Sequence, residues 1–511
     1  MTITARAAPR YSGSPSTRSL VDATGLDESQ IVRFDSNVPP SPPPYARAAT
    51  IARALATVND YSHGGHPALK RAIAERHGVA PENVVLGAGS GDLILLIARA
   101  LLRPGDEAAI VPARTFSLYG IAVAQAGASV GGSTPALTFT CRPNNPSGEL
   151  LDLPGARPLV VDEAYAEYAG VSAESLGGED LVVLRTFSKA FGLAAARVGY
   201  ALAGAQLAAE LNRWQAPHPI STMSAQLALA ALHDPPHVGA QIEERERLHG
   251  ELQRLGLAPL RSHTNFVFVP HEDPDGLADA LLQRGMVVRR YEDGIRINVR
   301  DRYDDDALLA ALAAALETPW SADSGAPSRS VRYLRATAET AVRVRLALDG
   351  SGVVLASGGD GLYDHLLEQL AFHAGMDLLV ESVGDLETGA HHSAEDAARA
   401  VGDALDRVLA DRRGLQRFGD ATLPMDEALA SAAVDLSGRP SSVIGIAPDP
   451  GLARHVLESL AQNARITLHV DARGSDAHHT AEAAFKAVGR ALRVALARQH
   501  GAGVASTKGV L

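Results

Sequence analysis

The chain has 511 residues and a formal net charge of −12 at pH 7, with 46% hydrophobic and 21% charged residues. This length and composition predict two or more domains with sizeable cores and exclude a wholly disordered chain. The acidic balance disfavours nucleic acid and anionic membranes as partners, so we expect small-molecule substrates. The single cysteine, and the lack of a signal-like or membrane-spanning apolar stretch, predict a cytoplasmic protein.

Residues 1–30 predict an N-terminal arm, which leads to a proline-stiffened loop at residues 39–44, PPSPPP. In residues 31–318, helix-like segments such as HPALKRAIAERHG alternate with short apolar runs such as RPLVVDEAY and LVVLRTF. This alternation indicates βα units around a largely parallel sheet. After Pro270, a helical segment, the strands MVVRR and GIRINV and a second helical segment predict a small α+β subdomain.

The polar segment at residues 319–329 predicts a linker, and residues 330–511 a further domain that contains an internal repeat. The segment HLLEQLAFHAGMDLLV is matched 90 residues later by HVLESLAQNARITLHV. Similarly, HHSAEDAARAVGDAL is matched 87 residues later by HHTAEAAFKAVGRAL. Two near-equal offsets predict a duplicated unit of sheet plus helices.

The first large region carries a set of residues suited to pyridoxal phosphate. Lys189 lies in SKAFGL, Arg197 follows eight residues later, and Asp162 and Asn145 precede them in DEAY and NNPSG. This cofactor needs a lysine amine, a carboxylate at its ring nitrogen, and cationic or hydroxyl donors for its phosphate. Because Asp162 ends an apolar strand, its carboxylate should emerge at a sheet edge.

This set resembles the fold-type I aminotransferases, and within them the histidinol-phosphate aminotransferases, over about residues 30–318. The resemblance implies pyridoxal phosphate as cofactor, Lys189 as the Schiff-base lysine and general base, and Asp162 at the ring nitrogen. Arg296 would clamp the carboxylate of the amino donor, and Tyr61 would reach the cofactor of a neighbouring subunit. The other implied cofactor-binding residues are Gly89, Ser90, Gly91, Thr186, Ser188 and Arg197 at the phosphate, Asn145 and Tyr165 at the ring hydroxyl, and Tyr119 stacked on the ring.

Two alternatives stay open for this region. One is a catalytically impaired assembly module. Its only support is the short segment of sixteen residues between Ala128 and Asn145, where the family carries a longer one, and the intact Lys189, Asp162 and Arg197 argue against it. The other is a different activity on the same fold, such as that of a threonine-phosphate decarboxylase. A Rossmann dinucleotide-binding domain is disfavoured, because GAGSGD lacks the G-x-G-x-x-G spacing.

The motif H-H-x-x-E occurs twice in the second region, at residues 391–395 and 478–482. On a helix, His391 and Glu395 share one face, while His392 points about 100° away. Neighbouring histidines therefore tend to serve different ions, and the duplicated motif predicts two metal ions. Histidines with carboxylates suit manganese, iron, nickel or zinc.

The segment from Arg332 to the C-terminus resembles the imidazoleglycerol-phosphate dehydratases, through AETAVRV, LYDHLLEQLAFH, RRGLQRFG, LPMDEALA, DLSGRP and STKGVL. The resemblance implies two manganese ions with the ligands His365, His391, His392, Glu395, His469, His478, His479 and Glu482. The implied substrate and acid–base group is Glu339, His365, Glu482 and Lys486. The implied phosphate-binding residues are Arg417, Arg439, Ser506 and Lys508.

Together the two resemblances predict an α/β fold-type I aminotransferase followed by a duplicated α+β dehydratase domain. The expected function is bifunctional: dehydration of imidazoleglycerol phosphate to imidazole-acetol phosphate, followed by its glutamate-dependent transamination to histidinol phosphate in histidine biosynthesis. Because the paired histidines diverge, we expect at least one ion to bridge subunits of a large homo-oligomer.

Overall fold

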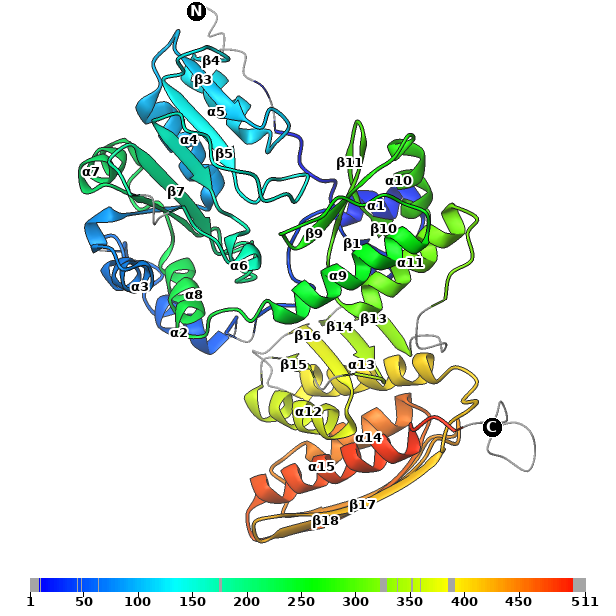
Figure 1. Cartoon of the computed structure of the whole chain (residues 1–511). Coiled ribbons are helices and arrows are strands. Elements are labelled where there is room, and N and C mark those ends of the chain that lie inside the picture. The colour runs from blue at the N-terminus through cyan, green and yellow to red at the C-terminus, as the bar shows by residue number, and fades with distance from the viewer. Residues whose placement is uncertain are drawn as a thin grey trace, which may run out of the picture. The chain divides into compact units, whose positions relative to one another are not determined.

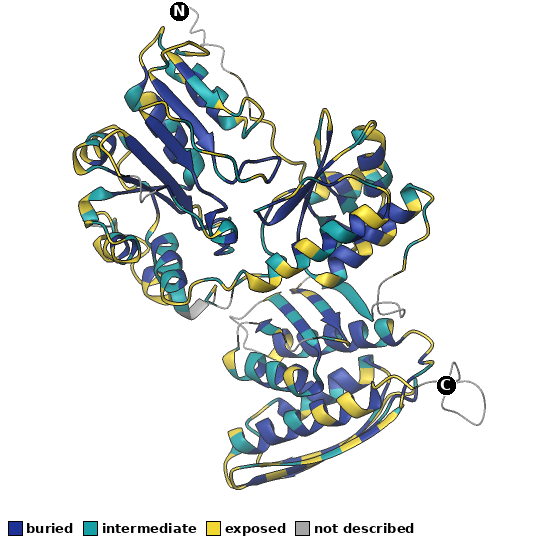
Figure 2. Cartoon of the chain, in the orientation of Figure 1, coloured by how far each residue is buried: buried dark blue, intermediate teal, exposed yellow. Residues whose placement is uncertain are grey.

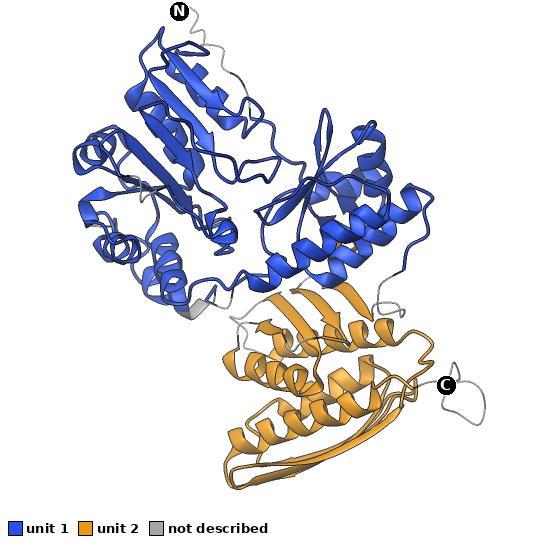
Figure 3. Cartoon of the chain, viewed as in Figure 1, with its two compact units in different colours: residues 1–26, 31–321 blue, residues 27–30, 322–511 orange. Residues whose placement is uncertain are grey.

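The computed structural model of the chain describes residues 9, 11–43, 45–46, 48–62, 64–173, 177–321, 329–337, 339–350, 353–358, 360–384 and 391–499. Most of the expected linker, and the two implied phosphate-binding residues Ser506 and Lys508, lie outside these residues. The chain divides into two compact units, residues 1–26 with 31–321 and residues 27–30 with 322–511 (Figure 3). Among the described residues, no helix combines the length and apolarity that crossing a membrane requires.

The first unit is built on a seven-stranded sheet of order β2-β8-β7-β6-β5-β3-β4. Strand β8 is antiparallel to both of its neighbours, and the other adjacent strands are parallel, so the predicted largely parallel sheet is confirmed. The strands are β2 (Val84–Gly87), β3 (Glu107–Val111), β4 (Ser129–Val130), β5 (Leu137–Cys141), β6 (Leu159–Asp162), β7 (Leu181–Thr186) and β8 (Gly199–Ala203).

Both faces of this sheet are buried, because alternate residues of β6 and β7 point into two separate apolar clusters. One cluster includes side chains of α4 (Ser90–Leu101), α5 (Leu118–Ala126) and α7 (Ala205–Trp214). The other includes side chains of α3 (Pro67–His77) and α8 (Thr222–His233). The apolar runs read in the sequence are therefore central strands between two helical layers (Figures 1 and 2).

The predicted small subdomain is a three-stranded antiparallel sheet of order β11-β12-β9 with helices on it. The segment MVVRR, expected as one strand, is divided between two ladders. Its first part pairs in parallel with the N-terminal β1 and its second part pairs with β12. The elements are β1 (Val32–Arg33), β9 (Phe266–Pro270), β10 (Met286–Val287), β11 (Arg289–Tyr291), β12 (Gly294–Asn298), α9 (Gly239–Arg254), α10 (Pro274–Leu282) and α11 (Arg302–Ala315).

Short helices precede and connect these parts. Helix α1 (Thr17–Thr24) begins at the N-cap Ser16, whose hydroxyl accepts from the backbone N–H of Ser19, and it buries Leu20. The expected N-terminal arm therefore contains a helix. The other short helices are α2 (Ala48–Leu55) and α6 (Ala166–Ala169).

The second unit contains the same topology twice. Its sheets have the orders β13-β14-β16-β15 and β17-β18-β20-β19, and in each the last strand is parallel to its neighbour while the others are antiparallel. The strands are β13 (Ser330–Ala336), β14 (Thr340–Ala347), β15 (Val354–Ser357), β16 (Asp377–Gly384), β17 (Phe418–Met425), β18 (Ala428–Asp435), β19 (Ser441–Ala447) and β20 (Thr467–Arg473).

Four helices of this unit lie between its two sheets and share one apolar core (Figure 1). They are α12 (Gly361–Ala374), α13 (His391–Leu409), α14 (Ala453–Asn463) and α15 (Ala477–Ala495). Glycines allow close helix pairs. A Cβ on Gly489 of α15 would lie 2.3 Å from the carbonyl oxygen of Leu370, and one on Gly402 of α13 would lie 2.7 Å from that of Leu460. The pairs α12–α15 and α13–α14 therefore each join one repeat to the other.

Candidate active sites

Lys189 lies three residues beyond the end of β7 and is half-buried. Its Nζ donates to the carbonyl oxygen of Ser36 at 3.2 Å. Burial and the positive charges of Arg296 and Arg197 lower the pKa of Lys189 to about 7, while Asp162 acts in the opposite direction. A large share of this amine is therefore unprotonated near neutral pH, as a nucleophile or a base requires.

Asp162 ends β6, as the sequence predicted, and its carboxylate is buried. Its Oδ2 accepts from the hydroxyl of Tyr119 at 2.9 Å and its Oδ1 accepts from the N–H of Ala164 at 3.1 Å. Burial raises the pKa of Asp162 to about 6. The Tyr119 ring stacks on the Phe139 ring, with the ring centroids 5.5 Å apart. This packing holds the hydroxyl of Tyr119 that donates to Asp162 and orients its carboxylate. The stacking of Tyr119 on a cofactor ring stays a prediction.

A cradle for an anion lies at the N-terminus of α4. Gly89 has a φ of +88°, and a Cβ there would lie 2.6 Å from Nη2 of Arg197. Two strands away from β2 in the sheet, at the end of β7, the Thr186 and Ser188 hydroxyls are 3.0 Å apart. Helix N–H groups, a guanidinium and hydroxyls suit a phosphate group. The structure thus brings together the predicted residues Gly89, Ser90, Gly91, Thr186, Ser188 and Arg197.

Arg296 on β12 is buried and faces the same region. Its Nη1 donates to Oδ1 of Asn145 at 2.5 Å, and its Nη2 donates to the carbonyl oxygen of Asp35 at 3.0 Å. Its Nε has no hydrogen-bond partner in the described part of the chain. The charge of Arg296 acts on both Lys189 and Tyr165, so these side chains surround one site. A guanidinium with a free donor suits a carboxylate.

Tyr165 and Tyr61 differ in their surroundings. The buried hydroxyl of Tyr165 accepts from the amide of Asn37 at 3.0 Å, and the Tyr165 ring lies 5.8 Å from Nζ of Lys189. Tyr61 is 73% exposed and stacks on His218 at 4.8 Å. Its predicted contact with a neighbouring subunit stays a prediction. The amine, carboxylate, hydroxyls and phosphate cradle are the donor set that pyridoxal phosphate requires, so the residues present fit it.

The second unit gathers histidines and glutamates into two clusters, and cluster A joins α12 to α15. Its members are His365, His478 and Glu482, whose ligand atoms all lie within 4.8 Å of one another. The Nε2 atoms of His365 and His478 lie 3.5 and 3.3 Å from Oε2 of Glu482. Burial alone would raise the pKa of Glu482, but Lys486, with Nζ 2.7 Å from Oε1, and His365 hold it below its usual range.

Cluster B joins α13 to α14 and consists of His391, Glu395 and His455. The Nε2 atoms of His391 and His455 lie 3.7 and 3.4 Å from the Glu395 carboxylate, and the two rings stack at 5.1 Å. Nε2 of His455 is buried without a hydrogen bond among the described residues. Arg399 forms an ion pair with Glu395. Two imidazoles and a carboxylate suit a divalent transition-metal ion, so both clusters fit the predicted ions.

The clusters are reciprocal, because each combines one histidine of one repeat with a histidine and a glutamate on a helix of the other repeat. His365 of the first repeat meets α15, and its counterpart His455 of the second repeat meets α13. Sequence reasoning missed His455 as a ligand, although its position 90 residues after His365 was the available signal. His469, which was expected as a ligand, is exposed on β20 and belongs to neither cluster.

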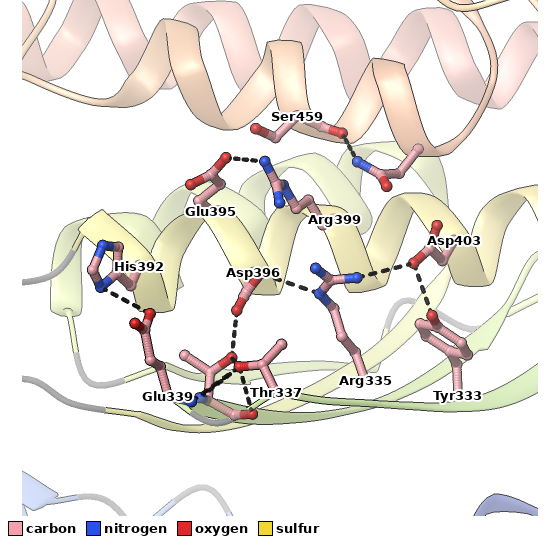
Figure 4. Close-up of polar contacts among 12 residues, drawn as sticks. Tyr333, Arg335, Thr337, Glu339, His392, Glu395, Asp396, Arg399, Asp403 and Ser459 are labelled. Atoms are coloured by element: carbon pink, nitrogen blue, oxygen red, sulfur yellow. Dashed lines mark hydrogen bonds and ion pairs between the residues drawn. The ribbon is translucent and has the colours of Figure 1, made fainter.

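The second histidine of each motif points to a different carboxylate. Nδ1 of His392 lies 3.5 Å from Oε2 of Glu339 (Figure 4), and Nδ1 of His479 lies 2.9 Å from Oε2 of Glu427. The sequence did not single out Glu427. A cavity of about 360 Å³ beside the first pair is lined by Arg335, Thr337, Glu339, His392, Glu395, Asp396 and Arg399.

Two of the predicted phosphate donors, Arg417 and Arg439, lie away from cluster A within one chain. Arg417, at the start of β17, pairs with Asp435 at 2.7 Å. Lys486 contacts Sδ of Met425, at the other end of β17, at 3.4 Å. Since a strand rises about 3.3 Å per residue, these ends are about 23 Å apart. The exposed Arg439 follows β18, close to Arg417 in the sheet. One chain therefore does not bring these donors to cluster A.

Comparisons with known proteins cover both units. The family model "Aminotransferase class I and II" matches residues 29–134 and 130–312, and "Imidazoleglycerol-phosphate dehydratase" matches residues 358–492. An imidazoleglycerol-phosphate dehydratase of Salinispora tropica is 51% identical over 203 residues, which cover 36% of this chain and 100% of that protein.

Two solved structures resemble the first unit. The histidinol-phosphate aminotransferase of Sinorhizobium meliloti, in complex with pyridoxal-5'-phosphate, has a TM-score of 0.54 and 24% identity, covering 60% of this chain and 95% of that one. The L-threonine-O-3-phosphate decarboxylase of Porphyromonas gingivalis has a TM-score of 0.50 and 20% identity, covering 56% and 100%. These likenesses show the fold-type I architecture. The chain belongs to the aminotransferase class I and II family through its first unit and to the imidazoleglycerol-phosphate dehydratase family through its second.

Proposed function

We propose that the chain catalyses two consecutive steps of histidine biosynthesis. The second unit would dehydrate imidazoleglycerol phosphate to imidazole-acetol phosphate, and the first would transaminate that product to histidinol phosphate with glutamate. The observation that carries the proposal is the presence in one chain of Lys189 beside Asp162 and of the two reciprocal clusters. The product of the dehydration is the keto substrate of the transamination, which makes the fusion chemically coherent.

In the first unit, pyridoxal phosphate when bound supplies an electron-withdrawing ring for chemistry at the α-carbon of an amino acid. Lys189, whose pKa is about 7, would present an unprotonated Nζ and take the proton from the α-carbon of the amino donor. Asp162, oriented by Tyr119, would face the ring nitrogen, and Arg296 would bind the α-carboxylate of the donor.

In the second unit, we propose one divalent ion, Mn²⁺, at each cluster, where it would stabilise negative charge on the imidazole of the substrate. We assign His455 to the ligand set together with His365, His391, His392, Glu395, His478, His479 and Glu482, and leave His469 out. The C2 hydrogen of the glycerol chain is weakly acidic, so a base must be held against it. Glu339, which lines the cavity beside His392, would take or return that proton.

The phosphate of the substrate would be bound by Arg417, Arg439, Ser506 and Lys508. Arg417 directly precedes β17, Lys486 contacts the last residue of β17, and the two ends of this strand are about 23 Å apart. We therefore propose that these donors serve a cluster of another copy of the chain. A homo-oligomer would then be needed to complete each dehydratase site.

The test follows imidazoleglycerol phosphate through both reactions with the full-length Mn²⁺-loaded protein. We expect imidazole-acetol phosphate alone at first, and histidinol phosphate once pyridoxal phosphate and glutamate are added. Lys189→Ala should lose the visible absorbance of bound cofactor and stop at imidazole-acetol phosphate with an unchanged dehydration rate. The matched control Lys70→Ala removes a lysine of α3 and should complete both steps.

Retained formation of histidinol phosphate in Lys189→Ala would contradict the assignment of the first site. A wild-type protein that binds the cofactor and does not transaminate would favour an impaired module. The likeness to a threonine-phosphate decarboxylase keeps a second candidate in view, and release of carbon dioxide from threonine phosphate would favour it over transamination.

A further inference from the structure

A cavity of about 620 Å³ on the second unit carries an excess of positive charge that the proposed reactions do not use. It lies where the C-terminal ends of α12 and α15 meet the turn after β14. Its volume is within the range of small-molecule sites, about 300–1,000 Å³. The charged residues in its lining are Arg329, Asp349, Arg490, Arg493 and Arg498, with His373 beside them.

The single carboxylate of the cavity neutralises only part of this charge. Asp349 accepts from Nε of Arg329 and from Nη2 of Arg498, both at 2.9 Å. Although burial raises the pKa of Asp349, these two arginines hold it below its usual range. Arg490 and Arg493 are exposed, and neither forms a hydrogen bond or ion pair with a residue that the structure describes.

The two arginines could serve only to balance the C-terminus of α12. Arg493 does lie against it, since a Cβ on Gly375 would be 3.8 Å from its Cζ. A helix C-terminus carries about half a negative charge, however. Among the lining residues that the structure describes, four arginines with one carboxylate still leave roughly two and a half positive charges. Helix capping therefore accounts for a small share of the charge.

One wall of the cavity is an exposed aromatic ring. Phe372 is 58% exposed, and its ring meets that of His373 edge-on at 5.5 Å. Burial, then the charges of Lys486 and Arg490, lower the pKa of His373, so the positive field extends to this wall. An open phenyl face beside guanidinium groups can stack a planar ring while the cations bind its phosphates.

We propose that this cavity binds an organic polyphosphate with a planar ring, of the nucleoside diphosphate class. Its phosphates would contact Arg490 and Arg493, and its ring would lie on Phe372. Arg417 and Arg439 do not line the cavity, so it is distinct from these two proposed donors to the substrate phosphate.

The test uses the full-length Mn²⁺-loaded protein and titration calorimetry with adenosine 5'-diphosphate and pyrophosphate, in excess Mg²⁺ so that the probes leave the metal of the protein in place. We expect both to bind, more weakly as salt rises. The double variant Arg490→Gln/Arg493→Gln should bind at least about tenfold more weakly, as loss of charge-assisted contacts implies. The matched control Arg473→Gln removes an exposed arginine that pairs with Asp471, and should bind as the wild type does.

Phe372→Ala should weaken binding of adenosine 5'-diphosphate and leave that of pyrophosphate unchanged; equal affinity for the nucleotide would overturn the role of the ring. Arg417→Gln separates this proposal from the proposed function. Loss of binding in that variant with full binding in the double variant would overturn the cavity. No binding to the wild type, or an equal loss in Arg473→Gln, would do the same. The dehydration rate of the double variant reports its folding.

Discussion

Four charged side chains set the properties of the first site. Arg296 and Arg197 disfavour the protonated form of Lys189, Asp162 favours it, and burial adds to the effect of the arginines, with a resulting pKa of about 7. An ordinary lysine has a pKa near 10.4 and is almost fully protonated at neutral pH. The surroundings of Lys189 therefore raise its reactive fraction at neutral pH by orders of magnitude.

Arg296→Gln should move the attachment of pyridoxal phosphate to higher pH. Loss of the positive charge removes a cause that lowers the pKa of Lys189, so the pKa rises above about 7 and the amine loses its proton at higher pH. The measurement is the visible absorbance of the bound cofactor as a function of pH. Arg289→Gln, on the neighbouring strand β11, is the matched control. A midpoint that stays the same or falls in Arg296→Gln would contradict the charge argument.

His455→Ala and His469→Ala should differ in metal content. His455 is one of the three side chains of cluster B, whereas His469 is exposed on β20. We expect His455→Ala to lose one of two bound ions per chain and roughly 10–100-fold in dehydration rate. His469→Ala should keep both ions. Metal analysis of the purified proteins decides, and the opposite pattern would restore His469 to the ligand set.

At the scale of elements, glycines at matched positions of the two repeats set the spacing of the helices that carry the clusters. Gly489 brings α15 against α12 and Gly402 brings α13 against α14. Each close approach places a histidine of one helix beside the glutamate of the other. The two clusters that we propose as metal sites thus depend on two glycines, which have no side chain.

Gly489→Ala should destabilise the second unit by about 1–3 kcal/mol, because the added methyl group would lie 2.3 Å from the carbonyl oxygen of Leu370. Hydrogen exchange of the amides in α12 and α15 measures the opening of this unit separately from the first. Gly361→Ala, at the start of α12 with nothing within 4 Å of its Cβ, is the control. Equal exchange rates of these amides in both variants would contradict the prediction that the added methyl group destabilises the packing of α12 against α15.

Local sequence pattern predicts the elements that carry the sites, and it does not predict their partners. RPLVVDEAY is apolar up to Asp162, and β6 ends at that residue. The H-H-x-x-E motifs predict helices, and α13 begins at His391. The hydrogen bond of Tyr119 to Asp162 and the division of MVVRR between β10 and β11 depend on contacts between distant segments, which periodicity does not encode.

At the scale of the whole molecule, the two units differ in whether one chain brings the predicted residues of a site together. The cofactor residues around Lys189 meet within one chain, whereas Arg417 and cluster A lie at opposite ends of β17. The sequence predicted both groups of residues. The distance between Arg417 and cluster A could not be predicted from the sequence, because it depends on how β17 runs between them in the fold.

We expect at least one ion to bridge two copies of the chain, and such an ion favours the assembled protein by mass action. Chelation of the metal should therefore dissociate the assembly and stop dehydration. The bound pyridoxal phosphate should keep its absorbance, because Lys189 lies in the other unit. Light scattering and a dehydration assay, before and after Mn²⁺ is restored, follow the change. An active monomer in the presence of chelator would rule out sites completed by a second copy.

The exchange of His365 and His455 between the two repeats has a consequence for the ancestry of the second unit. Neither repeat holds a complete triad, so a single-repeat ancestor could have closed these sites only as a two-fold symmetric homodimer. Joining two copies in one polypeptide makes that pairing independent of dilution. It also allows the sequences of the two halves to diverge. Four residues after the glutamate of its cluster, one half has Arg399 and the other Lys486.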